Sequence, residues 1–260
     1  VELMRAFGGA ADADAADRLE GLIASAKWLK ALPFSVTEDR AATLFVVPCS
    51  AHKLDGGRPM DAGQPTDSIA ESMPSATYRR IAQLREELRE RARVDDRVLR
   101  PAYARYSEGS LWRLSPEPGD WSTRLEGSHV LILSGAYGVV RWDDEIGWYD
   151  LDLENAGWPE GVLEDALVAY ARAHRIRQVI AFGSATRGRY TDVLRAIPWR
   201  TADVKRATLV EPGTFEGDYA DSDRPIGHAL WHLLGGGTID LNWTSDTGVH
   251  LSFEERLPTT

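Results

Sequence analysis

The sequence predicts an α/β fold: a single domain with a central, mostly parallel sheet flanked by helices and a cleft at the carboxyl ends of the strands. Three short apolar runs, at residues 43–47, 130–133 and 178–182, have the continuous character of strands that are buried on both faces. Each run leads into a loop rich in glycine, serine or charged residues. Ligands bind beyond the carboxyl ends of parallel strands, so these loops form the candidate site.

The amino-terminal segment is predicted to be a packing helix without chemistry. Residues 9–32 are rich in alanine, with leucines and an isoleucine near helical spacing and aspartates near the start. We therefore divide the chain into a helical extension over residues 1–40 and an α/β domain over residues 41–260.

The loop after the first predicted strand, residues 48–59, carries three candidate site residues: Cys49, Ser50 and Lys53. A lone cysteine after a strand is either a small buried apolar residue or a nucleophile. Lys53 is either a solvated surface cation or a group that holds an anion, and a desolvated lysine can also act as a nucleophile.

A long helix is predicted over residues 73–94, where apolar residues recur at spacings of three and four. Arginines and glutamates alternate on its other face, which favours a solvated face over a phosphate-binding ridge. A short strand is expected over residues 98–102, followed by a short helix and an irregular loop over residues 103–124.

The segment over residues 130–153 is the predicted floor of the site. Its apolar run ends in a dense group of polar residues and glycines, in which we assign ligand-binding roles to Ser134, Gly135, Tyr137, Arg141 and Tyr149. Asp144 or Asp143 would act as a base or stabilise a cation, with Lys53 as nucleophile or anion clamp. The alternative is structural, because buried arginine–carboxylate pairs also hold turns together.

The carboxyl-terminal part contains a predicted helix over residues 159–174, the third apolar strand, and a loop in which Ser184 is a candidate polar ligand. The remainder, including a helix over 226–234 and a strand over 249–253, is expected to form a lid or an added edge. His228 and His232 stand four residues apart, but without a third ligand we assign them to packing and predict no metal site. No nucleotide fingerprint is present, and no cofactor is predicted.

Composition limits the partners. The formal net charge of −10 argues against a general nucleic-acid coat, although a local basic groove is compatible with it. The sequence has one cysteine, no apolar run of membrane-spanning length and no pattern of a secretory leader. We therefore expect the protein to be cytoplasmic and to have no membrane partner.

The central segment resembles the signature of the YaaA family of peroxide-stress proteins, S-G-x-Y-G-x-x-R-x-x-D-x-I-x-x-Y-x-L, without a gap. The loops at 48–55 and 181–190 resemble the family more loosely. Trp142 and Trp148 stand where the family has prolines, and Asp150 where it has an arginine. The resemblance implies an α/β fold with a cleft, DNA binding and a role in the response to peroxide.

A second, shorter resemblance involves the PCSAHK loop, which is similar to the PCS…K loop of the archaeosine synthase core. That core has a fold similar to uracil-DNA glycosylases, and its lysine-transfer chemistry acts on a modified base. Two hypotheses therefore stand: a protein that binds nucleic acid or a nucleobase or nucleotide, and an enzyme that acts on a nucleobase or nucleoside, at the glycosidic bond or the base itself.

Overall fold

The computed structural model describes residues 40–60, 67–113, 120–184, 188–213, 222–240 and 242–255, together with the backbone of strand β1, Phe34–Ser35. The helix predicted over residues 9–32 lies outside the described residues. Within them the α/β prediction is confirmed, because a six-stranded, mostly parallel mixed sheet is combined with a small antiparallel sheet and seven α-helices.

The main sheet has the strand order β11-β9-β8-β2-β5-β6. Its four central strands are parallel, and β11 and β6 are antiparallel edges. The strands are β2 Thr43–Pro48, β5 His129–Ser134, β6 Gly138–Arg141, β8 Gln178–Phe182, β9 Arg206–Pro212 and β11 Leu251–Glu255. The added edge expected at residues 249–253 is therefore β11.

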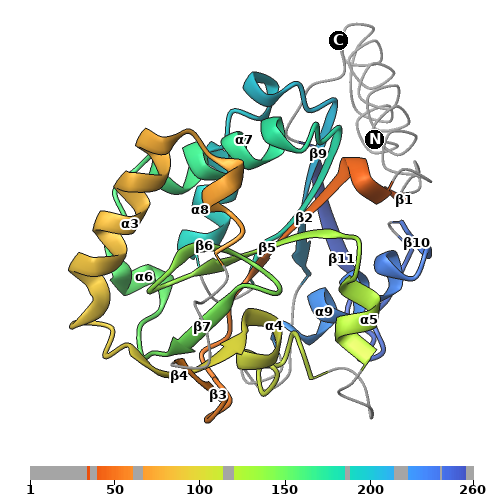
Figure 1. Ribbon diagram of the computed structural model, residues 1–260. Coiled ribbons are helices and arrows are strands. Elements are labelled where there is room, and N and C mark those ends of the chain that lie inside the picture. The colour runs from red at the N-terminus through yellow and green to blue at the C-terminus, as the bar shows by residue number, and fades with distance from the viewer. Residues whose placement is uncertain are drawn as a thin grey trace, which may run out of the picture.

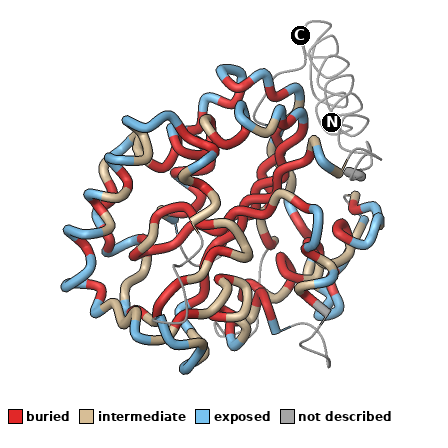
Figure 2. Tube along the Cα trace, viewed as in Figure 1, coloured by how far each residue is buried: buried red, intermediate tan, exposed pale blue. Residues whose placement is uncertain are grey.

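The apolar runs occupy the middle of the molecule. Every residue of β2 and β8 is buried, as is every residue of β5 after His129. Figure 2 shows the buried residues concentrated along these strands. Uninterrupted apolar runs form strands here because helices cover both faces of the sheet and leave no solvated face that needs polar side chains.

Helices form a layer on each face of the sheet (Figure 1). On one side α7, Val162–Ala173, packs against α3, Ser75–Arg89, and α8, Gly188–Ala196. On the other side α9, Arg224–Leu234, packs against β9 and against α5, Asp120–Leu125. Two short helices complete the set, α4 at Ala102–Arg105 and α6 at Leu153–Ala156.

A three-stranded antiparallel sheet lies beyond the carboxyl ends of β2 and β5, at the bottom of Figure 1. It consists of β3 Arg58–Pro59, β4 Asp95–Pro101 and β7 Glu145–Trp148. The remaining strands, β1 and β10 Thr238–Ile239, pair with each other. The 3-10 helices among the described residues are η1 Arg40–Ala42, η3 Ala70–Ser72 and η4 Trp199–Ala202.

The predicted floor of the site is more regular than its sequence suggests. Residues 135–137 form a tight turn between β5 and β6, in which Ser134 pairs with Gly138. Gly138 has φ 71°, a left-handed conformation that glycine adopts without strain. Strand β2 lies between β5 and β8, so the chain crosses over β2 after leaving β5, and the carboxyl end of β2 marks the topological switch point.

Candidate functional site

A cluster of hydroxyl and thiol groups is buried at the carboxyl ends of β2 and β5. We call Cys49, Tyr106, Ser134, Tyr149 and Tyr190 the hydroxyl cluster; each is at most 3% exposed. The hydroxyls of Tyr106 and Tyr149 lie 2.8 Å apart, and Ser134 Oγ donates to Tyr149 Oη at 2.9 Å. Cys49 Sγ lies 2.9 Å from Tyr190 Oη. The structure thus brings three of the predicted site residues together, but inside the core.

Tyr106 and Tyr149 are neutral phenols at physiological pH. Burial, followed by the neighbouring thiol of Cys49, raises the pKa of Tyr106 and of Tyr149 well above the usual value for tyrosine. Neither phenol can therefore serve as a base near pH 7. The network instead satisfies its own polar groups where the two central strands end.

Lys53 covers this cluster on the solvent side. Its Nζ lies 4.1 Å from the centre of the Tyr149 ring, a cation–π contact. The loop that carries Lys53 is anchored by a backbone hydrogen bond of 2.7 Å from Leu54 N to Arg105 O. Arg105 is fully buried and donates to the carbonyls of Leu54, Val98 and Ile146, so it ties the loop after β2 to β4 and β7.

Asp144 holds the turn between β6 and β7. Its side chain is 2% exposed, and its two oxygens accept backbone N–H groups from Ser68 and Arg141, each at 2.7 Å. Burial raises the pKa of this carboxyl group, while the two backbone hydrogen bonds oppose the shift. Both oxygens are thus engaged within the protein, which matches the structural alternative for Asp144.

Arg141 lies away from the hydroxyl cluster. It pairs with Leu131 across β5 and β6, three residues before the end of β5 at Ser134, which is roughly 10 Å at the rise of a β-strand. Its guanidinium group forms two hydrogen bonds with the carboxylate of Asp143. The structure therefore brings Arg141 and Asp143 to each other and does not bring them to Lys53.

Tyr137 and Asp144 both line a small pocket of about 230 Å³ beside α3. Tyr137 Oη donates to Asp96 Oδ1 at 3.1 Å and accepts from Gly147 N at 3.0 Å. Burial, and then the carboxylate of Asp96, raises the pKa of Tyr137. An ion pair of 2.6 Å between Arg85 and Asp67 closes part of the pocket wall.

The remaining predicted residues have packing contacts. A Cβ on Gly135 would lie 2.2 Å from Leu151 O, so only glycine fits at this crossing of two backbones. Ser184 Oγ donates to Asp223 Oδ1 at 2.9 Å, linking the end of β8 to the residue before α9. Ser50 Oγ accepts from His52 N at 3.0 Å.

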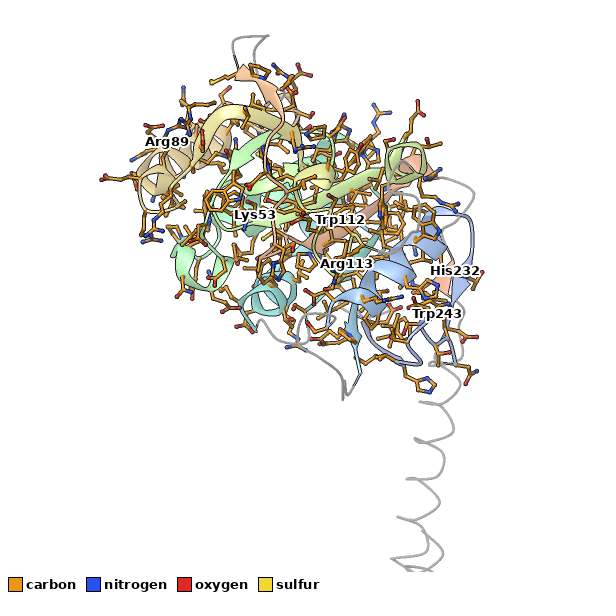
Figure 3. All side chains as sticks on the ribbon, turned by 90° about the horizontal axis from the view of Figure 1, so that it is seen from below. Lys53, Arg89, Trp112, Arg113, His232 and Trp243 are labelled. Carbon is orange, nitrogen blue, oxygen red and sulfur yellow. The ribbon has the colours of Figure 1, made fainter. Side chains whose placement is uncertain are left out.

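A larger pocket of about 790 Å³ opens beside the loop after β2. We call it the tryptophan pocket, and it is lined by His52, Leu54, Arg100, Tyr103, Ala104, Ser107, Glu108, Trp112, Arg113 and Trp121. In Figure 3, which views the molecule from below, Lys53, Trp112 and Arg113 lie near the middle of the face. The pocket thus occupies the crevice that the fold creates at the end of β2.

Aromatic rings in edge-to-face contact lie behind one wall of the tryptophan pocket. The ring centres of Trp112 and Trp121 are 5.0 Å apart, and Trp121 in turn lies 4.9 Å from Trp231 on α9. Trp121 Nε1 donates to the carbonyl of Trp112 at 2.7 Å. Trp112 Nε1 is buried, and it has no hydrogen-bond partner among the residues that the structure describes.

The rim of the tryptophan pocket carries charged groups. Arg100 is fixed by its Nε, which donates to the carbonyls of Asp55 and Gly56 at 3.0 Å each. Arg113, His52 and Glu108 are exposed, whereas Trp112 and Trp121 are each 2% exposed. The charged groups that line the pocket are therefore open to solvent, whereas its two tryptophans are almost entirely covered by protein.

No protein-family model and no curated protein matches this chain. The resemblance to the YaaA family therefore rests on the spacing of the central motif and stays a prediction. Similarly, the resemblance to the archaeosine synthase core rests on one short loop.

Sequence reasoning did not assign any of the residues that line the tryptophan pocket. Most of them come from residues 100–121, which the sequence marks only as a short strand, a short helix and an irregular loop. A usable signal was present, because tyrosine, tryptophan and arginine are unusually dense there for a surface loop.

The described residues contain no group of three or more His, Cys, Asp and Glu side chains placed to hold a metal ion. His228 instead accepts a hydrogen bond of 2.7 Å from Asp246 N, and His232 Nε2 lies 3.1 Å from Thr238 O. Within the same part of the chain, no helix has the length and apolar character needed to cross a membrane.

Proposed function

We propose that this protein binds nucleic acid or free nucleotides in the tryptophan pocket. The observation that carries the proposal is the combination of a half-buried aromatic ring, Tyr103, with the guanidinium groups of Arg100 and Arg113 in one pocket at the carboxyl end of the central strand β2. Its volume of about 790 Å³ falls within the range of small-molecule sites, roughly 300–1,000 Å³.

The two parts of the pocket match the two parts of a nucleotide. A half-buried aromatic side chain such as Tyr103 can bind a base face by stacking, an interaction that is tolerant of base identity. The guanidinium groups of Arg100 and Arg113 bind phosphate through charge-assisted hydrogen bonds. Because the net charge is −10, an anion is attracted only to such local cationic sites.

The first test is fluorescence anisotropy with labelled single-stranded and duplex DNA at several salt concentrations, with nucleosides and nucleotides as competitors. We expect saturable binding that weakens with salt and is reversed by nucleotides. No binding of DNA or nucleotides even at low salt would overturn the proposal.

The same series locates the site. If the tryptophan pocket binds the ligand, Arg113→Gln weakens binding, whereas Arg141→Ala, expected from the sequence to weaken DNA binding and lower its salt dependence, leaves it unchanged. If Arg141→Ala weakens binding and Arg113→Gln does not, the site lies beside β6 and not in the tryptophan pocket.

The alternative proposal, an enzyme that acts on a nucleobase or nucleoside, has one observation in its favour. Lys53 is held over the ring of Tyr149 between His52 and Leu54, two residues that line the tryptophan pocket. Asp144 fits the role of base poorly, since both of its oxygens accept backbone hydrogen bonds. Under the enzyme proposal, Lys53→Ala abolishes turnover of a nucleoside substrate. If turnover is unchanged in Lys53→Ala and in Asp144→Asn, neither residue has a catalytic role.

The role in peroxide stress is proposed from the central motif alone. Its test is survival of cells lacking the protein after exposure to peroxide, with complementation by the native chain and by Arg113→Gln. Equal survival with and without the protein would remove this part of the proposal.

A further inference from the structure

Four exposed cations gather at the amino ends of β8 and β9, at the opposite edge of the sheet from the tryptophan pocket. We call this group the cationic edge, and it consists of Arg172, Arg175, Arg177 and Lys205. Arg172 lies in the last turn of α7, Arg175 and Arg177 lie in the turn that leads into β8, and Lys205 lies directly before β9. In Figure 1, α7 and β9 are labelled at the top, whereas the small antiparallel sheet is at the bottom.

Hydrogen bonds hold together the two segments that carry these cations. Lys205 N donates to Arg177 O at 2.8 Å, and Arg177 Nη1 donates to Asp203 O at 3.4 Å. Arg172 Nη2 donates to Thr201 O at 2.6 Å. The cations are therefore neighbours on one surface, although they come from separate parts of the sequence.

Carboxylates do not balance the charge of the cationic edge. The guanidinium groups described above contact backbone carbonyls, and none of the four side chains forms an ion pair with a described residue. By contrast, the neighbouring Arg206 pairs with Glu255. Residues 172–177 and 200–206 together contain six lysines and arginines but one carboxylate, that of Asp203. The edge is thus a local excess of positive charge on an acidic protein.

The end of helix α7 explains only part of this charge. Cations are favourable at the carboxyl end of a helix, which accounts for Arg172 and Arg175. The same effect gives no reason for Arg177 or Lys205. Arg175 has φ 54°, a left-handed conformation that glycine would adopt without strain. The chain therefore carries a cation at a position where the backbone favours glycine.

We infer that the cationic edge binds an acidic segment of a partner protein, in which several aspartates or glutamates lie close together. Guanidinium groups bind carboxylates through charge-assisted hydrogen bonds, often two at a time. The rest of the chain is more acidic than its overall net charge of −10. With a Debye length of about 8 Å at physiological salt, the attraction is confined to ligands that contact the edge itself.

Nucleic acid matches this surface less well than an acidic peptide does. A nucleic-acid strand that extends beyond the edge meets the acidic remainder of the protein, which repels a polyanion. The indole of Trp199, next to the second segment, is 1% exposed and cannot stack on a base. This inference goes beyond the proposed function, because the two sites lie at opposite edges of the sheet.

The test is fluorescence anisotropy of a labelled peptide of consecutive glutamates, titrated with the full chain at low and at physiological salt. Oligothymidylate and vesicles that contain phosphatidylserine are the alternative probes. We expect the peptide to bind saturably and to bind more weakly as salt is added, because the contacts are exposed ion pairs.

Two pairs of charge reversals locate the binding surface. Arg175→Glu combined with Lys205→Glu should weaken peptide binding about tenfold or more, since attraction becomes repulsion at two of four cations. The matched control is Arg93→Glu combined with Arg97→Glu, which changes the net charge equally. These two side chains are 78% and 89% exposed, and Arg93 also has a left-handed backbone, with φ 51°. Arg175→Gly removes one cation without backbone strain, and it should weaken binding by about threefold. Thermal melting confirms that each variant is folded.

Each outcome either supports or overturns the inference. Loss of peptide binding in the cationic-edge variants but not in the control supports it. A glutamate peptide that fails to bind at low salt would overturn it, and so would an equal loss in both pairs of variants, which would show that only net charge matters. Oligothymidylate or vesicles that depend on the cationic edge while the peptide does not would assign the surface to phosphate groups instead. Nucleotide binding in the tryptophan pocket is expected to be unchanged in all these variants, so this inference and the proposed function fail independently.

Discussion

At the scale of single residues, the structure separates groups that the sequence places in one motif. Ser134 and Tyr149 belong to the buried hydroxyl cluster, Asp144 holds a turn, and Arg141 pairs with Asp143 away from that cluster. Motif spacing cannot distinguish these places, because the four residues lie at or beside the ends of three different strands, and only the folded chain determines which of them meet. A polar residue in a motif can thus be required for the fold rather than for a ligand.

His129, which is half-buried, shows how a polar group at the edge of the core ties stability to pH. Its ring lies 4.8 Å from that of His174, and its Nδ1 is 2.9 Å from Tyr170 Oη. Burial, and then the neighbouring His174, lowers the pKa of His129 from 6.5 to about 4.

The stability of the protein should fall as the pH is lowered from 6.5 toward 4. Between these values the unfolded chain binds a proton at His129 that the folded protein excludes, so the contribution of the neutral ring is full above pH 6.5 and is lost toward pH 4. Thermal melting over this range tests the effect. We expect the stability of His129→Gln to decline less steeply with falling pH than that of the native protein. The control is His250→Gln, because His250 is exposed. Identical pH profiles for the native protein and His129→Gln would show that His129 is not the cause of the decline.

At the scale of elements, the apolar runs determined what the sequence could predict. The strands at 43–47, 130–133 and 178–182 and the helices around 75–89 and 162–173 were predictable because burial on both faces or on one stripe leaves a local pattern. Strands β6 and β7 were not predicted, since each has only four residues, with a charged residue at one end. The tryptophan pocket was missed because its walls come from irregular segments whose contacts form only in the folded chain.

The wall of the tryptophan pocket depends on a close contact between two such segments. A Cβ on Gly109 would lie 2.0 Å from Ser50 Oγ and 2.3 Å from Ser50 Cβ. Any side chain at residue 109 must therefore push the loop after β2 away from the segment that carries Trp112 and Arg113.

Gly109→Ala should destabilise the protein by about 1–3 kcal/mol, the usual cost of overpacking, and weaken nucleotide binding at the same time. Chemical denaturation and calorimetry measure the two effects. Gly188→Ala is the matched control, because a Cβ at Gly188 meets no atom within 4 Å. A Gly109→Ala protein with native stability and affinity would show that the two segments can separate without consequence.

At the scale of the whole molecule, the net charge limits where an anion can bind, and the sheet topology determines where the tryptophan pocket lies. The chain carries 40 acidic and 30 basic residues, so its average field repels a polyanion. Many of its arginines form ion pairs, as Arg89 does with Asp96 and Arg195 with Glu211. A pocket at the switch point of the sheet concentrates positive charge in one place without requiring a basic surface.

This arrangement predicts a small salt dependence for single-stranded DNA. Arg100 and Arg113 are the two arginines that line the tryptophan pocket, and two phosphate contacts on a single strand give a slope of log K against log salt of about −1.4. Anisotropy titrations with oligonucleotides of increasing length, between low and moderate salt, measure the slope. We expect it to stay constant once the strand fills the pocket, because the acidic surface outside adds no phosphate contacts. A slope that becomes steeper with every added nucleotide would instead indicate an extended basic groove, and the site would then have to include arginines beyond the pocket.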